Sequence, residues 1–201
     1  MKEIPSFRLN FRHEIAYEVN SQVPFTGIAV GMDTTGETQI KACYKDGELE
    51  GEWISYYFSG QWKTKANYKK GKKNGPYEAY YENGQLQIKR TYENGVLDGP
   101  YERYYENGQL NSKGTYINSA DDGPYEQYYE NGQLNIKRTY KNGVLDGPYE
   151  SYYENGQLGY KENYKNGVLD GPYERYDENG KLLYKVTYKD GDVEGPFEPY
   201  S

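Results

Sequence analysis

The sequence predicts an all-β protein: an elongated, twisted, single-layer antiparallel meander of tandem 24-residue β-hairpin repeats, without helices. Three observations support this prediction. Glycine recurs every 24 residues from Gly27 to Gly195, and each repeat carries two turn dipeptides of the Asn-Gly type. The runs between these dipeptides are rich in tyrosine and threonine, which favour strands. No segment has a sustained helical period of 3.6 residues.

The repeat reads Gly-Pro-Tyr-Glu-x-Tyr-Tyr-Glu-Asn-Gly-Gln-Leu-x-x-Lys-x-Thr-Tyr-Lys-Asn-Gly-Val-Leu-Asp, and its residues are numbered as positions 1 to 24. Three regions follow from it. Residues 1–26 predict N-terminal capping strands, because the run "FRLNFRHEIAYEV" within them alternates between apolar and polar residues. Residues 27–194 predict seven repeats, and residues 195–201 a truncated C-terminal repeat. Atypical terminal repeats are usual in stacked repeat proteins.

The dipeptides at positions 9–10 and 20–21 predict two-residue type I′ turns, because both residues tolerate a positive φ. Such turns place position 7 opposite 12, position 4 opposite 15, and position 14 opposite position 3 of the next repeat. Since side chains alternate along a strand, positions 3, 7, 12, 14, 18 and 23 then share one face of tyrosine and leucine. The other face collects glutamate, lysine, threonine and the tyrosine at position 6. Five cross-strand pairs are expected: Glu78–Lys89, Glu102–Lys113, Glu126–Lys137, Glu150–Lys161 and Glu174–Lys185.

One turn departs from the pattern, between Asn118 and Asp122. Ser119 stands where the other repeats have glycine, and Asp121 stands where most have leucine. A positive φ costs serine more than glycine. Two interpretations remain open: a neutral change, or a bend, bulge or local functional surface.

Composition limits the classes of partner. The net charge is −7 and the pI about 5.0, which argues against nucleic acid or an anionic membrane and is compatible with a basic protein partner. Cys43 is the one cysteine, so the chain forms no internal disulfide. The sequence shows no apolar run of membrane-spanning length and no signal-like N-terminus. We expect a cytoplasmic protein, unless a leader was removed.

Residues that carry chemistry are scarce. His13 is the only histidine, and nothing orients it toward Cys43. Carboxylates are abundant, but they recur identically in each repeat, whereas an active site needs one singular arrangement. Zinc spacings, calcium loops and phosphate loops are missing. We therefore expect no catalytic residue, no metal and no cofactor.

The sequence offers no helix or second sheet to cover the tyrosine and leucine face. The sheet would then curl over its own rings, pair face to face with a second copy, or receive a partner, so the chain is a monomer or a homodimer. Tyrosine is enriched at interaction hot spots. The expected partner-binding residues are large residues that differ from their equivalents or lie near the irregular turn: Trp53, Trp62, Tyr101, Tyr105, Tyr125 and Tyr129.

The run "YYENGQL…YKNGVLDGPYE" resembles the MORN repeat (membrane occupation and recognition nexus), in the variant widespread in bacteria, from about Thr26 to Tyr200. The resemblance implies an extended sheet that binds partners and does no chemistry. Bacterial members are often designated antitoxins or immunity-like proteins, which implies an inhibitor of a partner such as a basic toxin or effector. Eukaryotic members are linked to membranes and phosphoinositides. The alternatives are a membrane- or lipid-associated module and a self-assembling structural spacer.

Overall fold

The computed structural model describes residues 1–199, with side chains for residues 1–195. The chain is nearly all-β, as predicted, and its helical element within this range is the single 3₁₀ turn η1 (Ser6–Arg8). It divides into two units, Met1–Leu97 and Asp98–Ser201. Tyr200 and Ser201, which end the expected truncated repeat, lie outside the described residues.

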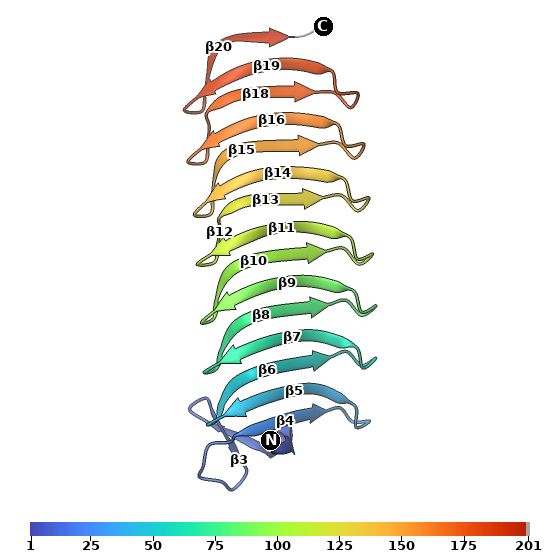
Figure 1. Cartoon of the computed structure of the whole chain (residues 1–201), viewed down its shortest axis with the longest axis vertical. Coiled ribbons are helices and arrows are strands. Elements are labelled where there is room, and N and C mark those ends of the chain that lie inside the picture. The colour runs from blue at the N-terminus through green and yellow to red at the C-terminus, as the bar shows by residue number, and fades with distance from the viewer. Residues whose placement is uncertain (200–201) are drawn as a thin grey trace. The chain divides into compact units, whose positions relative to one another are not determined.

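In the first unit, β4 to β9 follow one another as an antiparallel meander (Figure 1). β1 pairs with β4 in parallel, and β2 and β3 form a separate two-stranded hairpin. The strands are β1 (Glu3–Pro5), β2 (Leu9–Arg12), β3 (Ile15–Glu18), β4 (Gly27–Met32), β5 (Thr38–Lys45), β6 (Glu48–Tyr56), β7 (Trp62–Lys69), β8 (Lys72–Tyr80) and β9 (Leu86–Glu93).

The second unit continues the same hairpin pattern, again as an antiparallel meander. The strands are β10 (Val96–Tyr104), β11 (Leu110–Ile117), β12 (Ala120–Asp121), β13 (Gly123–Tyr128), β14 (Leu134–Lys141), β15 (Val144–Tyr152), β16 (Leu158–Lys165), β17 (Val168–Leu169), β18 (Gly171–Tyr176), β19 (Leu182–Lys189) and β20 (Asp192–Pro199). The two-residue strands β12 and β17 are the starts of longer strands that are interrupted before the glycine at position 1.

The turn at positions 20–21 is the type I′ turn that the sequence predicts. Asn94 and Gly95 both have positive φ, 51° and 91°. The irregular turn keeps this geometry, because Asn118 and Ser119 have φ of 50° and 67° and Ile117 lies opposite Ala120. The serine therefore bears the backbone strain that glycine avoids elsewhere.

The prediction of a type I′ turn at positions 9–10 is wrong. Between Asn83 and Gly84, only the glycine has a positive φ. The Asn83 side chain instead accepts a hydrogen bond of 2.9 Å from the Gln85 N–H, as asparagine does in turns. The loop widens as a result, and Tyr80, not Tyr81, lies opposite Leu86. Position 12 therefore pairs with position 6, not with position 7.

The predicted pairing of position 14 with position 3 of the next repeat is also wrong. Ile136 lies opposite Ser151, at position 5, because the β14–β15 ladder shifts by two residues near the Asp-Gly-Pro segment. Gly147 sits in this irregularity with φ of 120°, a conformation that suits glycine in a bulge. The shift places Arg138 directly opposite Tyr149.

The buried core of the first unit lies under its N-terminal segment. Ala16 and Phe25 pack with Ile4 and Ala29, and all four side chains are at most 5% exposed. The backbone joins them, since the Ala16 N–H donates to the Gly47 oxygen and the Phe25 N–H donates to the Ala16 oxygen, both at 2.8 Å. The segment thus supplies apolar cover that the meander itself lacks.

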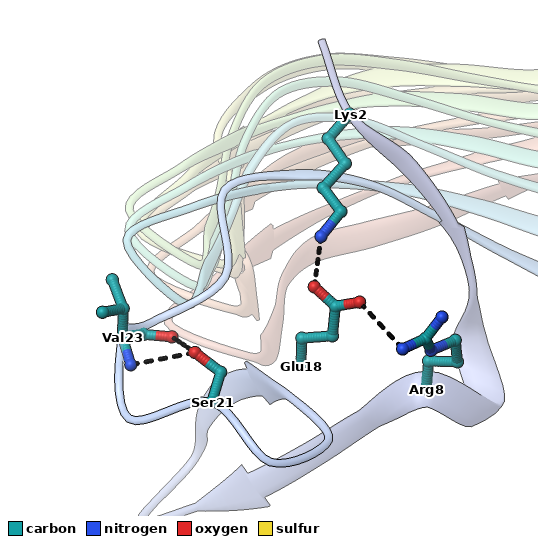
Figure 2. A network of polar contacts seen from close by, with 5 residues as sticks. All are labelled: Lys2, Arg8, Glu18, Ser21 and Val23. Atoms are coloured by element: carbon teal, nitrogen blue, oxygen red, sulfur yellow. Dashed lines mark hydrogen bonds and ion pairs between the residues drawn. The ribbon is translucent and has the colours of Figure 1, made fainter.

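Polar contacts also fix the N-terminal segment (Figure 2). The Lys2 ammonium and the Arg8 guanidinium both contact the Glu18 carboxylate, Arg8 at 3.3 Å. The hydrogen bond from Lys2 lowers the pKa of Glu18. Nearby, the Ser21 hydroxyl donates to the Val23 oxygen and accepts from the Val23 N–H, both at 3.0 Å. Exposed ion pairs of this kind contribute little to stability, so their main effect is to fix the position of the segment.

Candidate binding surface

One face of the sheet in each unit gathers positions 3, 14, 16, 18 and 23, and we call it the tyrosine face. The tyrosines at positions 3 and 18 of a repeat contact each other there. The ring centroids of Tyr77 and Tyr92 are 5.9 Å apart, and those of Tyr125 and Tyr140 are 6.2 Å apart. The prediction that positions 3, 14, 18 and 23 share a face is confirmed by these contacts and by those described next.

Four half-buried tyrosines form a continuous stack on the tyrosine face of the second unit. The stack takes its rings alternately from positions 3 and 14 of two successive repeats: Tyr149, Tyr160, Tyr173 and Tyr184. Their centroids are separated by 5.7, 6.5 and 5.8 Å, and neighbouring rings are within 11° of parallel. Burial, followed by a hydrogen bond with Tyr184, raises the pKa of Tyr173 to about 12. Stacked aromatic pairs stabilise beyond their buried area, so the stack is a rigid aromatic surface.

Arginine at position 16 lies over the tyrosine rings in both units. The Arg138 guanidinium carbon is 4.5 Å from the Tyr125 centroid and 5.0 Å from the Tyr140 centroid. The Nε atoms of Arg138 and Arg90 are buried without a hydrogen-bond partner. Cation–π attraction offsets part of this cost. Sequence reasoning missed these arginines, although the pairing of positions 3 and 16 could have indicated them.

Tyr101 differs from the tyrosines equivalent to it, because it is only 4% exposed. Its ring stacks on Tyr116 at 4.3 Å, and position 16 of this repeat is Gly114, over which the ring lies. Its hydroxyl donates to Asp121 at 2.7 Å. Burial, with that carboxylate, strongly raises the pKa of Tyr101. Tyr101 is therefore a core residue of its repeat.

The opposite face is held together by hydrogen bonds between tyrosine and glutamate. In five repeats the hydroxyl at position 6 donates to the carboxylate at position 4: Tyr80 to Glu78, Tyr104 to Glu102, Tyr128 to Glu126, Tyr152 to Glu150 and Tyr176 to Glu174. Burial, with these carboxylates, raises the pKa of Tyr104, Tyr152 and Tyr176 to about 12. We call this the glutamate face.

The five expected Glu–Lys pairs are cross-strand neighbours on the glutamate face, so this register prediction is confirmed. Ion pairs form in two directions. Lys185 contacts Glu174 of its own repeat at 2.8 Å, whereas Lys113 contacts Glu126 of the next repeat at 2.9 Å. Lysine at position 15 thus lies between two glutamates.

Trp62, at position 12, lies on the glutamate face, which corrects its predicted place on the tyrosine face. Its ring is 5.9 Å from that of Tyr80, and the Lys65 ammonium is 2.9 Å from its centroid. The cause is the wide turn, which pairs position 12 with position 6. Trp62 is 49% exposed.

Tyr105 and Tyr129, at position 7, lie in the wide turns. Each hydroxyl donates at 2.8 Å to a backbone oxygen of the next repeat, Tyr105 to Tyr128 and Tyr129 to Tyr152. Both rings are half-buried. These hydrogen bonds link successive wide turns, so both tyrosines stabilise the stacking of the repeats.

Trp53 lines a cavity of the first unit that has a volume of about 480 Å³. Tyr57, Phe58 and Ile40 also line it. Phe58 occupies position 8, where later repeats have glutamate, and it is 83% exposed. Two of these four lining residues, Trp53 and Phe58, thus depart from the repeat.

The described residues contain no group of three His, Cys, Asp or Glu side chains that could hold a metal ion. His13 lies in the β2–β3 turn, and Cys43 is half-buried on β5. Helices of sufficient length and apolarity to cross a membrane are absent from residues 1–199.

The comparison with protein families matches the chain to the MORN repeat variant, in six tandem copies. The matched residues are 49–70, 73–94, 97–118, 121–142, 145–166 and 169–190. Each copy runs from position 23 to position 20, so it contains one hairpin around the wide turn. Curated proteins give no match. Because these copies cover more than half of the sequence, and each coincides with a hairpin of the sheet, the chain belongs to the MORN repeat variant family.

Proposed function

We propose that the chain is a non-catalytic scaffold that binds a partner protein through its tyrosine face. One observation carries the proposal: the stack of Tyr149, Tyr160, Tyr173 and Tyr184 lies on strands of the second unit whose main contacts are with neighbouring strands of the sheet. The four rings are only half-buried. A rigid surface of half-buried tyrosines binds at a small entropic cost, because its side chains are already ordered.

The tyrosine face suits a partner better than the glutamate face does. On the glutamate face, the hydroxyls at position 6 already donate to carboxylates. Displacing them would cost hydrogen bonds that a partner must replace. The tyrosine face instead offers ring surface, which supplies most of the binding energy at interaction hot spots.

The residues proposed from sequence contribute unequally to this surface. Trp53 and Tyr125, both at position 3, belong to the tyrosine face and remain in the proposal. Trp62 lies on the glutamate face, and Tyr101 is buried, so we leave both out. Tyr105 and Tyr129 border the face in the turns.

A narrower form of the proposal is an antitoxin- or immunity-type inhibitor, which would block a basic partner protein. The net charge of −7 supports it, because opposite charge speeds association and favours basic partners. It predicts a stoichiometric complex with a basic protein from the native cell.

The test is affinity capture from native extract with face-specific variants. Tyr160→Ile breaks the stack but copies Ile136, the residue at the same position of the preceding repeat. Tyr152→Phe removes a hydroxyl on the glutamate face and serves as the matched control. The proposal expects one stoichiometric protein that Tyr160→Ile loses and Tyr152→Phe keeps. Loss with both variants, or capture of anionic vesicles in place of a protein, contradicts it.

A further inference from the structure

The same four-residue frame occurs in both units, with opposite charge at one position. It consists of position 23 of one repeat and positions 3, 16 and 18 of the next, all on the tyrosine face. The first unit has Lys73, Tyr77, Arg90 and Tyr92, whereas the second has Asp121, Tyr125, Arg138 and Tyr140. Lysine thus stands where aspartate stands 48 residues later.

In the first unit, two cations share the same two rings. The Lys73 ammonium is 4.7 Å from the Tyr77 centroid and 5.2 Å from the Tyr92 centroid. The Arg90 guanidinium carbon is 4.6 and 5.2 Å from the same centroids. Neither cation forms an ion pair with a carboxylate of the described residues. The frame therefore holds two positive charges without a neutralising group.

In the second unit, the chain supplies the negative charge itself. Burial raises the pKa of Tyr140. The Arg138 cation lowers this pKa and the Asp121 carboxylate raises it, so both charges act on the same hydroxyl. The ring contacts of Arg138 match those of Arg90 within a few tenths of an ångström. Arg138, like Arg90, forms no ion pair with a carboxylate of the described residues, and the Asp121 carboxylate accepts its hydrogen bond from Tyr101. The two frames differ in their charges: the second holds one positive and one negative side chain, whereas the first holds two positive ones.

The turn beside Lys73 adds further positive charge. Lys69, Lys70 and Lys72 lie in the same β7–β8 hairpin, where most later repeats have asparagine at position 20 and valine at position 22. Lys69 and Lys72 are even cross-strand neighbours, an arrangement that like charges disfavour. Lys73 therefore lies beside three further lysines, and the Glu50 carboxylate also lies at this turn, where it accepts a hydrogen bond of 2.8 Å from the Lys70 N–H.

We propose that the Lys73–Arg90 pair recognises a carboxylate on an acidic segment of a partner protein. The inference rests on the proposed function and specifies the chemistry of one contact on the tyrosine face. Because the proposed partner is a protein, the anion that complements these two cations is a side-chain carboxylate. The net charge governs approach at long range, whereas this pair acts at contact distance, where salt screens less.

The test follows the Nε–H signals of Arg90 and Arg138 by NMR in the full-length chain. The probe is a capped heptapeptide of alternating glutamate and threonine, and the same peptide with glutamine is its neutral control. The glutamate peptide should shift the Arg90 signal saturably and leave the Arg138 signal in place. Arg138 is thus an internal control in each spectrum.

Lys73→Leu is the matched variant, because Leu97, Leu145 and Leu169 occupy this position in other repeats. It should weaken peptide binding roughly tenfold, as expected for losing one charge at a partly desolvated contact. Lys73→Asp, which copies the second frame, should abolish binding. Equal shifts at Arg138, no effect of either variant, or a response to phosphatidylserine vesicles but not to the peptide would overturn the proposal.

This experiment separates the inference from the proposed function. If the peptide fails to bind while a captured protein still depends on Tyr160, only the carboxylate site is wrong. If the peptide binds at Arg90 but no partner protein depends on Tyr160, the scaffold proposal fails and the site remains.

Discussion

The hydroxyl of Tyr101 donates a 2.7 Å hydrogen bond to Asp121. Two residues around Tyr101 differ from the repeat. Asp121 stands where most repeats have leucine, and Gly114 stands where the preceding and following repeats have arginine. A Cβ at Gly114 would lie 2.9 Å from the Tyr101 ring. The glycine therefore makes room for the ring, and the aspartate accepts its hydroxyl. The irregular turn belongs to this local rearrangement.

Asp121→Leu should destabilise the chain, although it restores the residue of other repeats. The Tyr101 hydroxyl would lose its acceptor while its ring stays buried, which costs about 1–3 kcal/mol. Urea denaturation followed by circular dichroism measures the change. Asp121→Asn keeps an acceptor oxygen and should cost less. Equal stability of Asp121→Leu and the unsubstituted chain would show that the bond contributes little.

Gly114→Ala should also destabilise, by about 1–3 kcal/mol, because overpacking displaces a buried ring. The backbone itself tolerates alanine there, since Gly114 lacks a positive φ. In a Tyr101→Ala background the same substitution should be nearly neutral. The double-mutant cycle in urea gives this coupling, and additive effects would contradict the close packing of ring and glycine.

The sequence predicted local features of the fold better than the ladder between repeats. The turn at Asn94 and Gly95 was predictable, because positive φ is a property of those two residues. The wide turn around Asn83 was not predictable, because the Asn83 side chain accepts a hydrogen bond from the Gln85 N–H and so favours this turn over a type I′ turn. The shift near Gly147 also escaped prediction, since a bulge depends on both strands at once.

The candidate site was also predicted only in part, because features local to one strand were predictable and pairings between strands were not. Tyrosines at positions 3 and 18 share a face because strand alternation is robust. Trp62 was placed on the wrong face by the turn error alone. The burial of Tyr101 depends on Gly114, a residue on the facing strand. A pattern read along one strand does not reveal such a pairing.

Gly147→Ala should cost more stability than Gly123→Ala. Both glycines have positive φ, 120° and 86°, and alanine there is strained by about 1–2 kcal/mol. A Cβ at Gly147 would also lie 3.3 Å from Thr139, whereas nothing lies within 4 Å of one at Gly123. Urea midpoints of the two variants test this order. If Gly123→Ala lowers stability as much as Gly147→Ala does, the backbone strain alone sets the loss and the contact with Thr139 contributes nothing.

Trp62 and Lys65 should be energetically coupled across the glutamate face. The ammonium lies over the indole ring, a contact worth about 0.5–1 kcal/mol at an exposed site. A double-mutant cycle with Trp62→Leu and Lys65→Ala measures it. The control cycle pairs Trp62→Leu with Tyr77→Leu, whose side chain is on the tyrosine face, and should show almost no coupling. Coupling between Trp62 and Tyr77 would indicate that Trp62 lies on the tyrosine face, and would contradict its position on the glutamate face.

Alkaline pH should destabilise the chain between about pH 10 and pH 12. Burial and the glutamate acceptors raise the pKa of Tyr104, Tyr152 and Tyr176 from 10.0 to about 12. Between these values the folded chain binds more protons than the unfolded chain, so stability is complete below pH 10 and falls as pH rises through 12. Phenolate absorbance, with circular dichroism, follows both events. Tyr152→Phe should remove one such group and flatten the pH dependence, and an unchanged profile would mean that the bond to Glu150 does not protect that hydroxyl.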